Sequence, residues 1–96
     1  MIRGTLDIQK LSNPGSTGDV YQVHFEDLAG NTYNAGMSKV EVENLLYNKL
    51  GLNMEVDDLH ASIDELKHIG RVTLENIETE ETELMNSGLV YLPYAG

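Results

Sequence analysis

The strongest constraint on the fold is the alternation of apolar and polar residues in the first third of the chain. The apolar positions are Ile2, Leu6 and Ile8 in residues 2–11, and Tyr21, Val23 and Phe25 in residues 20–26. A period of two is typical of a strand with one buried face. A glycine-bearing turn then leads into a third short stretch, Thr32-Tyr33-Asn34, so we expect a three-stranded antiparallel meander.

Residues 12–18 separate the first two alternating stretches. They consist only of Ser, Asn, Pro, Gly and Thr, which favour turns or a mobile backbone. The segment contains two glycines at its end but no lysine, and strand-like sequence follows it where a phosphate-binding loop would lead into a helix. We therefore expect a mobile loop within one domain.

A helix is predicted over residues 39–50. Ser38 and Glu41 have the spacing of a capping box, in which each side chain binds the other residue's backbone N–H. Apolar residues then recur at helical spacing on one side, and Gly51 follows as a left-handed C-cap. We expect this apolar side to pack on the sheet.

A second helix is predicted over residues 58–69, with Asp57 as its cap and Gly70 as its terminator. Its start has an alternative, because Ser62 and Glu65 also have capping-box spacing. In that case the helix begins at Ser62 and the residues before it are extended.

The C-terminal part predicts a fourth strand over residues 71–77, a short helix over 79–87 ended by Gly88, and an apolar strand over 89–92. Together these elements indicate an α+β fold, in β-β-β-α-α-β order with a possible short C-terminal helix and strand. We expect a small antiparallel sheet of four or five strands with two helices packed on one face. At 96 residues, the chain is expected to form a single domain, 1–96.

Composition narrows the classes of function. The chain has no cysteine, which excludes disulfides, thiolate nucleophiles and cysteine-ligated metals, and favours a cytoplasmic location. It has no apolar run of about 18 residues, so membrane insertion is not expected. Sixteen acidic and six basic residues give a net charge of −10, and twelve of the acidic residues lie between Glu41 and Glu83. Such a charge repels nucleic-acid backbones and indicates a partner with a basic surface.

One group of residues could bind a metal ion. His60, Asp64 and His68 are spaced by four and four, so they form a stripe along the second predicted helix. Two imidazoles and a carboxylate are ligands that divalent transition metals accept. The stripe is also typical of a solvated helix flank, and it loses His60 if the helix begins at Ser62.

Two other candidate chemistries have simpler interpretations. Ser38 follows Gly36 closely, but its capping role explains it without a nucleophilic function. The glutamates of residues 75–83 could attract calcium, yet the Asp/Asn loop with a central glycine that makes an EF-hand is missing. The sequence shows no catalytic signature and implies no cofactor.

Two exposed features predict a partner-binding surface. The first is the acidic group Glu78, Glu80 and Glu81, which has no basic neighbour, and the second is the aromatic C-terminal segment with Tyr91, Leu92 and Tyr94. Tyrosine offers apolar area with a polar tip and is common in interfaces. The C-terminal segment is either the last strand of the sheet or a segment that docks on a partner.

Three functions remain open at this point. The first is a non-enzymatic protein–protein interaction module, and the second is an acidic mimic of nucleic acid that inhibits a DNA- or RNA-binding protein. The third is a metal-binding protein or enzyme that uses His60, Asp64 and His68. A homodimer through an exposed sheet edge is compatible with each of them.

Overall fold

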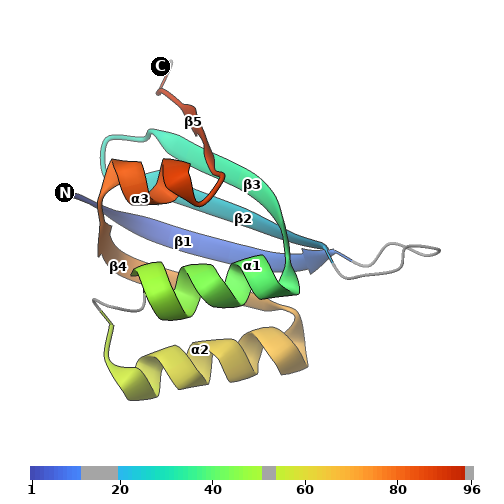
Figure 1. Cartoon of the computed structure of the whole chain (residues 1–96). Helices are drawn as coiled ribbons and strands as arrows, with labels where there is room; N and C mark the ends of the chain where they lie inside the picture. The colour runs from blue at the N-terminus through green and yellow to red at the C-terminus, as the bar shows by residue number, and fades with distance from the viewer. Residues whose placement is uncertain (12–19, 51–53, 95–96) are drawn as a thin grey trace.

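A computed structural model of the chain describes residues 1–11, 20–50 and 54–94, and it contains a five-stranded antiparallel sheet with helices on one face (Figure 1). The strands are β1 (Ile2–Leu11), β2 (Val20–Asp27), β3 (Thr32–Ser38), β4 (Arg71–Thr79) and β5 (Val90–Leu92). The helical segments are α1 (Lys39–Asn44), its π-helical continuation η1 (Leu45–Lys49), α2 (Val56–Ile69) and α3 (Glu81–Asn86). The predicted small α+β fold is confirmed. The predicted loop at 12–18 and the predicted cap Gly51 lie outside the described residues.

The strand order is β4-β1-β2-β3-β5. The predicted meander forms the centre of the sheet, where Leu6 pairs with Phe25 and Phe25 pairs with Tyr33. The C-terminal strands then occupy the two edges, β4 beside β1 and β5 beside β3, both antiparallel. Both edges of the sheet are therefore formed by the last two strands in the sequence.

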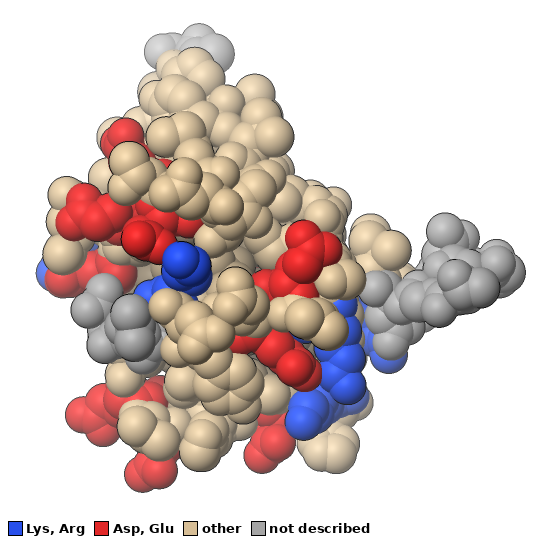
Figure 2. Space-filling view, in the orientation of Figure 1, with Lys and Arg blue, Asp and Glu red and all other residues tan. Residues whose placement is uncertain are grey.

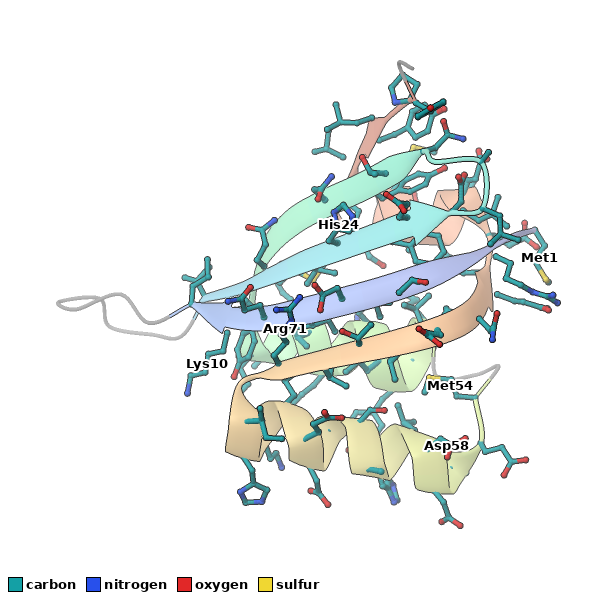
Figure 3. The ribbon with its side chains drawn as sticks, turned by 180° about the vertical axis from the view of Figure 1, so that it is seen from behind. Met1, Lys10, His24, Met54, Asp58 and Arg71 are labelled. Atoms are coloured by element: carbon teal, nitrogen blue, oxygen red, sulfur yellow. The ribbon has the colours of Figure 1, made fainter. Side chains whose placement is uncertain are left out.

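The core lies between the sheet and the helices. The period-two alternation turns one set of strand residues toward the helices, and these residues are buried together with the apolar stripes of the helices. The fully buried large side chains are Leu6, Ile8, Val23, Phe25, Tyr33, Val42, Leu45, Leu46, Leu50, Val72 and Leu84. The other face of the sheet carries the polar set and is seen in front in Figure 3.

The first helix begins as predicted. The Glu41 N–H donates to Ser38 Oγ at 3.3 Å, and the Ser38 N–H donates to Glu41 Oε1 at 3.1 Å. The backbone hydrogen bond from Ser38 is the main reason why the pKa of Glu41 lies below its usual value. The helix changes to π geometry at Leu45, which the sequence did not predict, and still buries Leu45 and Leu46.

The second helix begins two residues before its predicted start, at Val56, with Glu55 as N-cap. The predicted cap Asp57 therefore lies inside the first turn, where its negative charge suits the helix dipole. The alternative start at Ser62 is wrong. Ser62 is buried within the helix, where its hydroxyl donates to the Asp58 carbonyl at 2.8 Å, so it needs no capping role. Gly70 ends the helix in the left-handed conformation, as predicted, with φ 85°.

The C-terminal elements follow the predicted order with shifted ends. Strand β4 extends to Thr79, so α3 is shorter than the predicted helix and has Glu80 as its N-cap. Gly88 has a φ of 98° after this helix, and β5 begins at Val90. Within the described residues, no helix is long and apolar enough to cross a bilayer.

Strand β4 contains an irregularity that the sequence did not predict. Leu6 pairs with Leu74 and Gly4 pairs with Ile77, so two residues of β4 lie opposite Thr5 alone. One of them, Asn76, has a φ of 58°, in the left-handed region that asparagine tolerates better than most residues. This β-bulge bends β4 at the place where it faces the start of α2.

Candidate binding groove between α2 and β4

A groove with a volume of about 580 Å³ lies between α2 and the sheet edge formed by β4. Its lining residues are Leu50, Met54, Glu55, Asp58, Ala61, Ser62, Glu65, Leu74, Glu75, Asn76, Ile77 and Glu78. Figure 3 shows Met54 and Asp58 at the end where the chain enters α2, below the edge of β4. The groove is thus formed by the first half of the helix and the second half of the strand.

The lining of the groove combines apolar and acidic side chains. Leu50 and Ile77 are buried and Met54 and Leu74 are partly buried, which gives the groove an apolar floor. The carboxylates in the lining are Glu55, Asp58, Glu65, Glu75 and Glu78. The lining residues include no lysine, arginine or histidine, so the groove favours a positively charged occupant.

The spacing of the residues on α2 explains one wall of the groove. Leu59, Ile63 and Leu66 form the buried stripe that holds α2 on the sheet. The adjoining stripe consists of Asp58, Ala61, Ser62 and Glu65, at positions i, i+3, i+4 and i+7, and all four line the groove. The small residues Ala61 and Ser62 lie in the middle of this stripe, so short side chains separate the carboxylates of Asp58 and Glu65.

The bulge in β4 explains the opposite wall. Side chains alternate between the two faces of a regular strand, so one face would receive only every second residue. Here five consecutive residues, 74–78, line the groove, and they include the two that lie opposite Thr5. The bulge therefore brings Glu75 and Asn76 to the groove together with their neighbours.

The charges around Glu78 are partly balanced. The Arg3 guanidinium on β1 forms an ion pair and hydrogen bond with Glu78 across the strand boundary. Glu78 is one of the six residues predicted to bind a partner, and of those six it alone lines the groove. The remaining carboxylates of the groove come from α2 and from Glu75.

The predicted aromatic part of the partner surface lies at the opposite edge of the sheet. The C-terminal segment is the last strand, which was one of the two alternatives, and Tyr91 of β5 stacks on Tyr33 with ring centroids 5.1 Å apart. Leu92 pairs with Thr32 and is 54% exposed. The Tyr94 N–H donates to Asn31 Oδ1 at 2.9 Å. The structure therefore separates this aromatic segment from the groove by the width of the sheet.

Glu80 and Glu81 lie between these two regions, at the start of α3. Glu80 is 3.4 Å from the amino group of Met1, and Glu81 is exposed in the first turn of the helix. Neither side chain lines the groove. The six predicted residues thus do not form one surface.

His60, Asp64 and His68 lie exposed along α2, as the stripe predicted. With a rise of 1.5 Å per residue, the two histidines are about 12 Å apart along the helix axis, whereas zinc ligands lie about 2 Å from the ion. Among the described residues, no three His, Asp or Glu side chains are grouped so that they could hold a metal ion. The metal site therefore stays a prediction, and the described residues provide no grouping of ligands that supports it.

A row of polar side chains crosses the open face of the sheet and was missed in the sequence, because its members come from four strands. Arg71 Nη2 donates to Asp7 Oδ2 at 2.9 Å, and Thr73 Oγ1 donates to Asp7 Oδ1 at 3.0 Å. His24 Nδ1 lies 2.5 Å from Asn34 Oδ1 in the same row (Figure 3). The Arg71 hydrogen bond is the main cause that lowers the pKa of Asp7, against a smaller opposing effect of burial. Because each of these groups has a partner within the row, we interpret it as a link between strands.

No protein-family model matches the chain, and searches of curated proteins and of solved structures find no significant match. The geometry of the groove and the distribution of charge are therefore the features from which a function can be inferred.

Proposed function

We propose that the protein is a non-enzymatic interaction module that binds a basic segment of another protein in the groove between α2 and β4. The observation that carries this proposal is the combination of an apolar floor with five carboxylates and no basic residue in the lining. Lysine and arginine match such a lining, because their aliphatic stems pack on apolar surface while their charged ends reach carboxylates at the rim. A purely apolar segment has no positive charge for the carboxylates, and an acidic segment is repelled by them.

The charge of the whole helical layer supports a basic partner. The acidic residues of the helices and their N-caps are Glu41, Glu43, Glu55, Asp57, Asp58, Asp64, Glu65, Glu80, Glu81 and Glu83, whereas the basic residues are Lys39, Lys49 and Lys67. Figure 2 shows acidic side chains spread over this side of the molecule, with basic side chains in fewer places. A field of one sign accelerates the approach of an oppositely charged partner, and salt weakens this effect.

The proposal is tested with a defined basic probe, the hexapeptide acetyl-Lys-Val-Lys-Val-Lys-Val-amide, and with its Glu-Val counterpart. We expect the lysine peptide to bind and to shift the backbone amide resonances of α2 and β4 in NMR spectra of the ¹⁵N-labelled protein. We expect the glutamate peptide to leave them unchanged, because like charges repel. Absence of shifts with the lysine peptide, or shifts that avoid both elements, would contradict the proposal.

A pair of double variants provides the matched control. Asp58→Asn with Glu65→Gln removes two carboxylates from the groove, whereas Asp57→Asn with Asp64→Asn removes two exposed carboxylates of the same helix that do not line it. Exposed ion pairs contribute about 0.2–1 kcal/mol each, so the groove variant should weaken binding by about fivefold. The control variant should weaken it by less than about twofold. Equal losses would show that general charge, and not the groove, attracts the peptide.

An acidic mimic of nucleic acid is the second candidate, favoured by the concentration of carboxylates in the helical layer. A mimic uses the extended pattern of surface charge, so the two double variants should weaken its binding to a basic nucleic-acid-binding protein equally. A groove-binding module predicts unequal effects. The same two variants therefore discriminate between the candidates.

A further inference from the structure

We infer that the basic segment binds in an extended conformation and adds as a strand to the outer edge of β4. The inference rests on the proposed function and names the form of the partner segment. Strand β4 is an edge strand, and in the described part of the chain it pairs with β1 alone. The outward N–H and C=O groups of such an edge can pair with another extended chain.

The length of the groove sets the length of the segment. The lining spans residues 74–78 of β4 and 55–65 of α2, which correspond to lengths of about 13 and 15 Å. An extended chain rises about 3.3 Å per residue, so about four residues of an added strand lie along the groove. The outward backbone edge of β4 is the feature that selects an extended segment, because a helix satisfies its own backbone groups and does not pair with such an edge.

The two sides of β4 define a pattern for the added strand. Leu74 and Ile77 are on the helical side, where the floor of the groove is apolar, and Glu78 is on the open side, where it meets Arg3. Side chains of an added strand alternate between these sides. Basic residues would thus face the helical side, where their stems pack on the floor and their charged ends reach Asp58 and Glu65, and apolar residues would alternate with them on the open side.

The bulge limits what this edge accepts. Because Glu75 and Asn76 interrupt the regular pairing, a long and flat strand cannot add along the whole of β4. The carboxylates also repel a second copy of this chain, whose net charge is −10. The occupant that remains is a short, basic, alternating segment of another protein.

The decisive experiment changes the peptide and leaves the protein intact. In an extended chain, the N–H groups of alternate residues point to the same edge. We compare two isomers of acetyl-Lys-Val-Lys-Val-Lys-Val-amide, one with N-methyl groups on all lysine amides and one with N-methyl groups on all valine amides. Only one isomer blocks the edge that faces β4, so we expect one to bind at least about tenfold more weakly than the parent and the other to stay within about threefold.

Hydrogen exchange of the protein gives a second readout. On binding of the parent peptide, we expect slower exchange for β4 amides that do not donate to β1, and no such change in β5. Equal affinity of the two isomers, or unchanged exchange in β4, would overturn strand addition while leaving the basic-segment proposal in place. Failure of the parent peptide itself to bind would instead overturn the proposed function and the inference together.

A block isomer, acetyl-Lys-Lys-Lys-Val-Val-Val-amide, tests the alternation separately. It has the composition and charge of the parent, but each side of the strand then carries a mixture of lysine and valine. We expect binding weaker by about threefold, because the side that faces the groove then presents at most two lysines instead of three. Equal affinity would overturn the inferred side-chain pattern.

Discussion

The two edges of the sheet are attached to the meander in different ways. Strand β4 pairs with β1 from Ile2 to Gln9 and is further linked to it by the Arg3–Glu78 and Asp7–Arg71 ion pairs. Strand β5 pairs with β3 at three positions, and its main side-chain contact is the stack of Tyr91 on Tyr33. The first edge is long, polar and bulged, and the second is short and aromatic.

Edges of these two kinds differ in how selectively they can pair with another chain. Exposed edges promote unselective pairing, and charged residues and bulges are the usual protection. At β4 the same charges and the same bulge that protect against unselective pairing would also select the short, basic occupant proposed above. At β5 the exposed side chains are apolar, including Val90 at 63% and Leu92 at 54% exposure, and the strand is limited to three residues.

The largest effect is expected from Gly4→Ala, in the strand β1 that carries the β4 edge. A Cβ on Gly4 would overlap the carbonyl oxygen of Glu26 and lie 2.8 Å from the Cα of Asp27, both of them backbone atoms that cannot move alone. We expect a loss of about 3 kcal/mol or more in the free energy of unfolding, measured by urea denaturation. Gly36→Ala is the matched control on β3, because its Cβ would meet only Val20 Cγ1 at 3.9 Å. Similar losses in both variants would contradict the close approach at Gly4.

The next largest effect concerns β5. Tyr91→Ala removes the stack on Tyr33 and should destabilise the protein by about 2 kcal/mol, while Tyr91→Phe should cost less than about 0.5 kcal/mol. Hydrogen exchange should show faster exchange in β5 and an unchanged rate in β4. If the aromatic segment is also a contact for a partner, Tyr91→Ala weakens that contact and leaves peptide binding at β4 intact. Loss of peptide binding at β4 in this variant would contradict the prediction that the two edges of the sheet act independently.

Much of the fold could be predicted because it depends on local signals. The alternation in residues 2–11 and 20–26, the capping box at Ser38 and the terminator Gly70 are all readable over a few residues, and the structure contains each of them. The strand order could not be predicted, because it depends on which edges of the meander the last two strands reach. The bulge was missed for a related reason, since it exists only as a mismatch between β4 and Thr5.

The site was less predictable than the fold. The groove joins residues 55–65 of a helix to residues 74–78 of a strand, and no sequence signal singled out the stripe of Asp58, Ala61, Ser62 and Glu65. One signal was available. Glu75 and Glu78 belong to an acidic group without a basic neighbour in the sequence, which pointed to an acidic surface near the fourth strand but not to the helix beside it.

A smaller effect is expected from Tyr33→Phe, which sharpens the comparison at the β5 side. The Tyr33 hydroxyl is buried and has no hydrogen-bond partner within the described part of the chain. Removing an unsatisfied buried hydroxyl should stabilise the protein by about 1 kcal/mol in thermal or urea unfolding. Tyr47→Phe, at an exposed tyrosine on η1, is the control and should have no effect. Destabilisation by Tyr33→Phe would mean that the hydroxyl has a partner after all.

The pH dependence of the same variant follows from burial, which raises the pKa of Tyr33 above its usual value of 10.0. The folded state then holds the proton more tightly than the unfolded state does. The stability that this provides is complete below pH 10 and is lost as the pH rises through the folded pKa. Wild-type protein should therefore lose stability in alkaline solution more steeply than Tyr33→Phe, as measured by urea denaturation between pH 8 and 11. Parallel curves would contradict the raised pKa.

The smallest effect is expected on the open face beside β4, from Asp7→Asn. The pKa of Asp7 lies below its ordinary value of 3.8, chiefly because Arg71 hydrogen-bonds its carboxylate. A lowered pKa means that the contribution to stability is present above pH 3.8 and is lost as the pH falls through the folded pKa. The difference in urea midpoint between wild type and Asp7→Asn should thus be largest near pH 6 and should shrink below pH 4. Arg71→Gln should reduce the same acid-dependent loss, because it removes the donor on β4. A constant difference from pH 2 to 6 would show that Asp7 does not link the two strands through its charge, and the β4 edge would then depend on backbone pairing as β5 does.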